Sequence, residues 1–440
     1  MTTRLLLVLL VFTQSLCAVG RVTLRHTRTE PPAKTGRGAA EITRGIKRYA
    51  SMAEHARPRA HRKRYSPPPT HILGLHNQTA HNYTGPGVKF PSPLSLFNVT
   101  DSSTPTGRVD SLALNIEADD LGYLANVWLG TPPRQFRLLV DTGSADLWVP
   151  SDRCLSLTGE TCNHTYLGPG VSSSFVEMAS DEWAILYGSG YTSGRLVRDR
   201  ISFAGFDLES LTFGVTDLES NDFATSDVPF DGIMGLAGSR ASRMDQPSII
   251  EALAGAGLVP QPIMSYKLPR LADGKGDGEI TFGSMDLSKF DPLTAVSLKN
   301  LNSEGYWQVA LQDASVDSRM LDMRDRTGIV DTGTSLLVIP EEDAQAIHDV
   351  LEGIKLDDET WTIPCSTKHS LALSFGARQF SIDPRDLMFS PTDESGSCIS
   401  KIVSSGKAHP TLWLLGDVFL KNVYLSTNVA TNEVTFARLL

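Results

Sequence analysis

Short apolar runs separated by turn residues follow one another from about residue 120 to the end of the chain. Two of these runs, within 136–140 and 327–330, have the length and the β-branched content of buried strands. Each is followed by Asp, Thr, Gly and a hydroxyl residue, in tetrads that begin at Asp141 and Asp331. An Asp placed directly after a buried strand enters a dry environment, where its carboxylate needs hydrogen-bond donors. We expect the following Gly and hydroxyl residue to supply them.

The remaining periodicity predicts a mainly β protein with few helices. Residues 123–130 alternate as a strand, and residues 184–194 (AILYGSGYTSG) predict a hairpin whose reversal is permitted by Gly188 and Gly190. Helices are predicted only over 248–255 and 341–353. After each tetrad comes an apolar pair closed by Gly, in FDGIMGLA and in WLLGDVF, so the chain reads as two related halves.

The two tetrads predict a carboxylate pair if the halves pack face to face. Two close carboxylates in low dielectric cannot both ionise easily and share one proton, which gives one general base and one general acid. Such a pair can activate a water and protonate a leaving group. On these motifs the chain resembles the pepsin-like aspartic endopeptidases over roughly residues 120–440.

The resemblance implies a bilobal pepsin-like fold, mainly β, with two pseudo-twofold-related lobes at 120–305 and 306–440 and an active-site cleft between them. It implies catalysis by Asp141 and Asp331 without a covalent intermediate, a cofactor or a metal. The residues implied to support the pair are Thr142, Gly143, Ser144, Thr332, Gly333 and Thr334. The hydroxyls of Ser144 and Thr334 should bond the two aspartates, and Thr142 and Thr332 should join the two loops.

The hairpin at 184–194 resembles the flap that closes over a bound peptide in this family. Its implied substrate-binding residues are Tyr187, Gly188 and Ser189, with Trp148 placed to bond the Tyr187 hydroxyl. The alternative is an ordinary exposed hairpin. Because the tip carries Ser189 and no acidic residue, we expect apolar or aromatic residues on both sides of the scissile bond.

The N-terminal region differs in charge from the rest. Residues 1–18 contain a short apolar core behind Arg4, which predicts a secretory signal. The first 66 residues hold 14 Lys and Arg against 3 Asp and Glu, whereas the rest holds 26 against 47. Residues 19–64 therefore predict a basic propeptide that inhibits its own acidic body, with a nucleic-acid-binding arm or a solvated tail as alternatives.

Processing is predicted at the dibasic pairs 47–48 and 63–64. Related zymogens often place a propeptide Lys over the catalytic pair, and Lys34 or Lys47 could take this role here. The sequence itself selects neither. Residues 65–119, rich in Pro, Ser, Thr and Asn, predict a glycosylated linker or N-terminal extension.

Five cysteines fit a secreted chain, because Cys17 leaves with the signal and four remain. Of the three possible pairings, we favour the one that keeps each bond within one half, which also resembles two disulfides of the family. That pairing joins Cys154 to Cys162 and Cys365 to Cys398. The alternative, a zinc site, lacks any C-x-x-C spacing. Asn-x-Ser/Thr triplets predict glycosylation at Asn77, Asn82, Asn98 and Asn163.

The motifs of other hydrolases are missing. The chain has no HExxH, no GxSxG and no phosphate-binding Gly loop, and a two-carboxylate glycosidase would not require the residues that follow each Asp. We predict a secreted, acid-active aspartic endopeptidase that cuts polypeptides as a monomer, without nucleic acid or a membrane anchor. A vacuolar lumen is the alternative location. The alternative function is a catalytically silent pepsin-fold protein that binds or inhibits.

Overall fold

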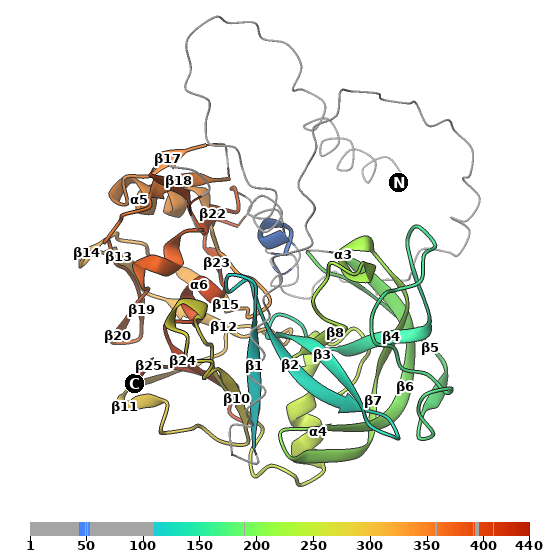
Figure 1. Cartoon of the computed structure of the whole chain (residues 1–440). Coiled ribbons are helices and arrows are strands. Elements are labelled where there is room, and N and C mark those ends of the chain that lie inside the picture. The colour runs from blue at the N-terminus through green and yellow to red at the C-terminus, as the bar shows by residue number, and fades with distance from the viewer. Residues whose placement is uncertain are drawn as a thin grey trace, which may run out of the picture. The chain divides into compact units, whose positions relative to one another are not determined.

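Among the residues that the structure describes, strands arranged in four sheets are the main secondary structure (Figure 1). The computed structural model describes residues 44–48, 50, 52 and 110–440, apart from 189, 357–358, 390, 392–395 and 408. All of these lie in one compact unit, Lys34–Leu440. The predicted signal peptide and the dibasic pair 63–64 lie outside the described residues. The same holds for Lys34, Ser189, Asn77, Asn82 and Asn98.

The largest sheet has 13 strands and gathers strands from both ends of the chain. Its order is β11 (Phe290–Lys299), β25 (Glu433–Leu439), β24 (Tyr424–Asn428), β9 (Ile263–Lys267), β10 (Glu279–Phe282), β1 (Ser111–Glu117), β2 (Gly122–Leu129), β3 (Arg134–Asp141), β8 (Gly232–Gly235), β4 (Leu147–Ser156), β7 (Phe206–Glu219), β6 (Tyr191–Phe203) and β5 (Val176–Leu186).

Three smaller sheets complete the C-terminal part. The five-stranded sheet has the order β12 (Gln308–Leu311), β15 (Arg326–Val330), β23 (Leu412–Leu415), β16 (Leu337–Ile339) and β22 (Ile402–Ser404). The four-stranded sheet contains β14 (Arg319–Met320), β13 (Asp313–Val316), β19 (Leu371–Phe375) and β20 (Arg378–Ser381). The last contains β17 (Ile354–Lys355), β18 (Trp361–Pro364) and β21 (Ser397–Ile399).

Helices are short and few among the described residues. The two predicted helices are present as α4 (Ile249–Gly255) and α5 (Glu341–Val350). Two single turns, α3 (Asn221–Ala224) and α6 (Asp417–Leu420), and the 3-10 turns Ser239–Ala241, Leu271–Asp273 and Pro384–Leu387 were not predicted. The helix α4 begins with a capping box, in which Ser248 and Glu251 satisfy each other's free backbone N–H groups.

The same local topology occurs twice, once around each tetrad. Strand β3 pairs in parallel with β8, which pairs antiparallel with β4. In the same way β15 pairs in parallel with β23, which pairs antiparallel with β16. The apolar pairs of FDGIMGLA and WLLGDVF therefore lie in β8 and β23, the strands that cross beside the two tetrads. The chain has the bilobal, mainly β fold that the two repeated motifs predicted.

The strand β1 corrects the prediction for residues 65–119, because its residues were assigned to the linker. Leu112, Leu114 and Ile116 alternate along it and are buried at 5%, 1% and 3% exposure, and the strand pairs with both β2 and β10. Their alternation is a valid strand pattern that the surrounding polar composition obscured. The predicted lobe boundary at 305/306 stays a prediction.

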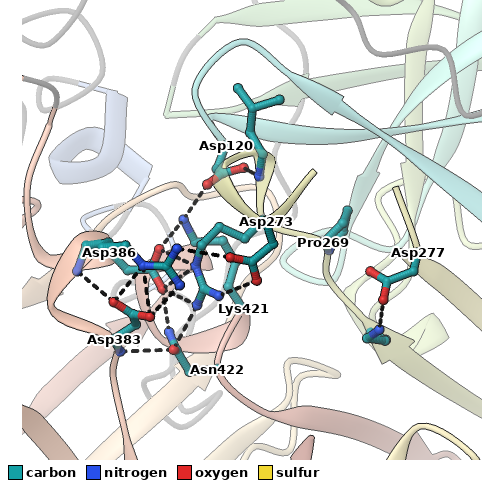
Figure 2. A network of polar contacts seen from close by, with 12 residues as sticks. Asp120, Pro269, Asp273, Asp277, Asp383, Asp386, Lys421 and Asn422 are labelled. Carbon is teal, nitrogen blue, oxygen red and sulfur yellow. Dashed lines mark hydrogen bonds and ion pairs between the residues drawn. The ribbon is translucent and has the colours of Figure 1, made fainter. Parts of the chain in front are cut away.

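A buried polar network joins segments from both halves of the chain (Figure 2). Lys421, which is 3% exposed, donates to Asp120 Oδ2 at 2.9 Å and lies 2.8 Å from Asp386 Oδ1. Arg270 pairs with the other oxygen of Asp386 at 2.6 Å. Burial alone would raise the pKa of Asp386, but the Arg270 hydrogen bond and the Lys421 charge lower it below its ordinary value. The network therefore holds Asp120, two residues before β2, against the C-terminal part of the chain.

Candidate active site

The two tetrads lie at equivalent ends of their strands. Asp141 is the last residue of β3, and Asp331 directly follows β15; both are 0% exposed. The Gly that closes each apolar pair permits this packing. A Cβ on Gly235 would lie 2.4 Å from Asp146 N, and one on Gly416 would lie 2.1 Å from Thr334 O. Both glycines are thus required by close backbone approach beside the tetrads.

The second residues of the tetrads tie the two loops together. The backbone N–H of Thr142 donates to Thr332 Oγ1 at 3.0 Å, and that of Thr332 donates to Thr142 Oγ1 at 3.0 Å. Each hydroxyl then donates across to the strand of the other half, Thr142 to Val330 O at 3.1 Å and Thr332 to Val140 O at 2.9 Å. These four bonds join the two tetrad loops.

The other tetrad residues surround the carboxylates with donors. Ser144 Oγ donates to Asp141 Oδ2 at 2.6 Å, and Thr334 Oγ1 donates to Asp331 Oδ2 at 2.5 Å. The remaining oxygens accept from backbone N–H groups, Asp141 Oδ1 from Gly143 at 2.8 Å and Asp331 Oδ1 from Gly333 at 3.0 Å. Each carboxylate therefore has one hydroxyl and one backbone donor in matching positions.

A cation that the sequence analysis did not select lies between the two aspartates. Arg48 Nε donates to Asp331 Oδ2 at 2.5 Å, and its terminal nitrogen donates to Asp331 Oδ1 at 2.9 Å and also to Asp141 Oδ1. Arg48 is 7% exposed, whereas Lys47 is exposed. The candidate Lys47 is therefore wrong for this position, and the candidate Lys34 lies outside the described residues.

Arg48 belongs to the N-terminal helical segment, which we define as residues 44–48, 50 and 52 (blue in Figure 1). Met52, one turn after Arg48, is 4% exposed and packs with Tyr306, Leu336 and Val338. A Cβ on Gly45 would lie 2.8 Å from Leu336 Cδ1. The spacing of Gly45, Arg48 and Met52 on one helical face is the sequence pattern that could have identified Arg48.

Burial and the neighbouring charges set the protonation of the three groups. Burial lowers the pKa of Arg48, but the charges of Asp141 and Asp331 raise it well above the ordinary value. Burial raises the pKa of Asp141, yet Arg48 holds it below its ordinary value. For Asp331, burial together with the charge of Asp141 outweighs Arg48 and raises the pKa. The two carboxyls thus differ in environment, since the charge of Asp141 adds to burial at Asp331.

The predicted hairpin is formed by β5 and β6. Tyr187 N donates to Gly190 O at 2.7 Å across its end, and Trp148 Nε1 donates to the Tyr187 hydroxyl at 2.8 Å. The Tyr187 ring also lies edge-on to Phe223, with centroids 5.5 Å apart. A Cβ on Gly188 would lie 2.2 Å from Arg48 N, so the hairpin contacts the backbone of the N-terminal helical segment. Ser189, at the tip, lies outside the described residues.

The predicted cysteine pairs are both present, with Cα atoms 5.4 Å apart for Cys154 and Cys162 and 5.1 Å apart for Cys365 and Cys398. Glu219 lies close to the first disulfide, whose bonded sulfurs offer no thiolate for a metal. Asn163, which directly follows Cys162, is exposed, as an acceptor of glycan must be.

In the part of the chain that the structure describes, we find no helix with the length and apolarity needed to cross a membrane.

Comparison with known proteins agrees with the geometry. A family model for eukaryotic aspartyl protease matches residues 122–439. The chain is 34% identical over 336 residues to a Trichophyton verrucosum protein named "Probable aspartic-type endopeptidase CTSD", covering 76% of this chain and 64% of that protein. It is 31% identical over 343 residues to rhizopuspepsin of Rhizopus chinensis, covering 77% and 84%. It is 29% identical over 364 residues to human cathepsin D, covering 78% and 87%.

The chain thus spans just under two thirds of the length of the Trichophyton relative. The family match covers both tetrads, the hairpin and the strands that cross beside the tetrads. On this match and on the paired carboxylates, the chain belongs to the eukaryotic aspartyl protease family.

Proposed function

We propose that this chain is the zymogen of an aspartic endopeptidase in which Asp141 and Asp331 hydrolyse peptide bonds. The observation that carries the proposal is the pair itself: two fully buried carboxylates, tied by reciprocal threonine bonds and given matching donors. Both come from one chain, so the site is complete in a monomer.

The chemistry follows from one shared proton. The ionised aspartate accepts a proton from a water held between the two groups, and this water attacks the scissile carbonyl. The protonated aspartate donates toward the carbonyl oxygen, which gives a neutral tetrahedral intermediate. Proton donation to the amine nitrogen then allows the C–N bond to break. The donors at Gly143, Ser144, Gly333 and Thr334 hold both carboxylates in place through these steps.

The N-terminal helical segment is the proposed inhibitor. Arg48 fills the space between the aspartates with a guanidinium, and a protein chain that is helical at this point does not present an extended peptide bond to the hairpin. The segment can therefore lie in the site without being cut. Its position also shields the dibasic pair Lys47–Arg48, because Arg48 is buried.

Acid is the proposed trigger for release. As pH falls, protonation of the pair removes a negative charge that holds Arg48, and the raised pKa of Asp331 favours this step. Protonation of acidic groups elsewhere weakens the attraction between the basic first 66 residues and the acidic remainder. These features favour an enzyme that is exported, or delivered to an acidic vacuole, before it becomes active.

The apolar preference predicted from the hairpin tip is supported by the surroundings of the site. Ile185, Tyr187 and Tyr306 line the space beside Met52. The same space is also lined by polar residues, among them Asp146 and Arg243. Apolar side chains that flank the scissile bond would bury surface there, and burial of a large apolar side chain stabilises binding by roughly 1.5–3 kcal/mol.

Binding of a transition-state analogue tests the zymogen proposal. We would titrate the full-length chain and the acid-processed chain with a peptide whose scissile carbonyl is replaced by a hydroxyl-bearing carbon. At neutral pH the processed chain should bind one analogue per chain, and the full-length chain should not. Equal binding by both forms would show that Arg48 does not block the site.

A further inference from the structure

A cavity of about 330 Å³ opens beside the dyad, and Met52 is not among the residues that line it. Gly333 and Thr334 of the second tetrad line one end of it. Its walls come from the end of β1, the strands β2 and β3, and the connection from α3 to β8. A peptide that places its scissile bond between the aspartates would therefore extend into this cavity.

The floor of the cavity is apolar. Leu124, Phe223 and Ile233 line it and are 0%, 3% and 1% exposed, and Leu139 and Phe230 complete the surface. An apolar side chain, or the aliphatic stem of a long charged one, can pack on such a floor.

The rim of the cavity is acidic. Glu117 lies at the end of β1, Asp222 in α3, and Asp227 in the connection that follows. Asp222 and Asp227 are exposed, and within the described ranges no ion pair or hydrogen bond reaches either side chain. Exposed Asp207, by contrast, is paired with Arg200.

The positive charges in the cavity wall come from the N-terminal helical segment alone among the described residues. They belong to Arg44 and Arg48, which line the cavity together with Gly45. Arg137 donates to Pro229 O at 3.4 Å but is not a lining residue. When the segment leaves, the wall keeps three carboxylates and loses both cations. The Arg44 side of the segment thus occupies the place that a basic substrate residue would take.

We propose that this cavity selects peptides with a Lys or Arg on one side of the scissile bond, a few residues from the apolar pair. The aliphatic stem packs on the apolar floor, and the charged head lies between Asp222, Asp227 and Glu117. This inference rests on the proposed endopeptidase function and adds a substrate class to it. It does not involve the hairpin tip, which carries no acidic residue.

Matched fluorogenic peptides test the inference. Each would carry the same central pair of apolar residues, with one Lys, Leu or Glu moved through the flanking positions, and kcat/KM would be measured on the processed chain at about pH 5, where ordinary carboxylates are ionised. We expect Lys at one position to raise kcat/KM about fivefold over Leu, mainly through KM, and Glu there to lower it.

The Asp222→Asn/Asp227→Asn variant should cut the all-apolar peptide as the parent does but lose most of the preference for Lys. The matched control is Asp322→Asn/Asp349→Asn, which removes two exposed carboxylates outside the cavity and should keep the preference.

Cleavage without a Lys preference, or a preference that survives the Asp222/Asp227 substitutions, would overturn this inference and leave the proposed function intact. If no peptide is cut by the processed parent chain, the proposed function fails and the inference fails with it.

Discussion

Thr142 and Thr332 exchange hydrogen bonds, with each backbone N–H donating to the other residue's Oγ1 at 3.0 Å. Both residues are 0% exposed. The bonds connect the two tetrads directly, so they determine how far apart the carboxylates lie. The geometry of the proposed dyad thus depends on two buried hydroxyls that also donate to the strand of the opposite half.

Replacing Thr142 by Val should destabilise the protein by about 2–4 kcal/mol, because Thr332 N–H and Val330 O each lose a buried partner. Urea unfolding of the full-length chain measures this. Thr142→Ser keeps the hydroxyl and should cost less than about 1 kcal/mol. A loss for Thr142→Ser as large as that for Thr142→Val would contradict the claim that the hydroxyl and its hydrogen bonds make the main contribution.

Replacing Arg48 by Ala should open the full-length chain to the transition-state analogue at neutral pH, because the guanidinium between the aspartates is gone. Lys47→Ala is the matched control, since Lys47 is the neighbouring residue of the same helical segment and is exposed. It should leave the site closed. Analogue affinity, measured by calorimetry, distinguishes the two. Opening by Lys47→Ala alone would contradict the assignment of Arg48.

Replacing Tyr187 by Phe should lower kcat/KM of the processed chain on the order of tenfold, since Trp148 Nε1 loses its acceptor and the hairpin loses a fixed position. Trp148→Phe removes the other partner of the same bond. Because both variants break one interaction, the double variant should lose little more than either single one. Additive losses in a double-mutant cycle would show that the two residues act separately.

Glu219 should make the free energy of unfolding fall as pH rises, which is opposite to the effect of an ion-paired acid. It is 1% exposed, and burial raises its pKa to about 7 despite the hydrogen bond from Thr216. Below about pH 4.5 the carboxyl is protonated in both the folded and the unfolded chain. Between that pH and about 7 only the unfolded chain loses the proton, so the free energy of unfolding falls as pH rises, by roughly 3 kcal/mol in all.

Glu219→Gln should therefore raise the free energy of unfolding at about pH 8 and leave it nearly unchanged at about pH 4. The control is Glu209→Gln, on the same strand β7 but exposed, which should show no such difference. Denaturant unfolding at the two pH values decides this. A pH-independent effect of Glu219→Gln would contradict the burial argument.

The sequence predicted the local features of the site well, because each depends on neighbouring residues. Asp141 and Asp331 follow buried strands, and Gly235 and Gly416 close apolar pairs where backbones approach. The hairpin around Tyr187 follows from two glycines at its reversal. In each case the feature depends on a few consecutive residues, so a short sequence pattern is enough to predict it.

The features that the sequence did not predict depend on contacts between distant segments. Arg48 reaches a residue 283 positions away, and nothing in its own surroundings distinguishes it from Lys47 except the helical face that it shares with Met52. Lys421 and Asp120 are likewise separated by 301 positions. Strand β1 was missed for a different reason, since its alternation lies beside a long polar segment.

The central claim is that the two aspartates perform the hydrolysis, and one substitution tests it most directly. We would measure cleavage of an apolar peptide by acid-processed parent chain and by Asp141→Asn produced in the same way, with urea unfolding of both as a check of the fold and analogue binding by the parent. The account predicts that the parent cuts in acid, and that Asp141→Asn loses at least about a thousandfold in kcat while still folding. An Asp141→Asn chain that cuts as fast as the parent would contradict the dyad, and a parent chain that binds the analogue yet cuts nothing would make it a binding protein.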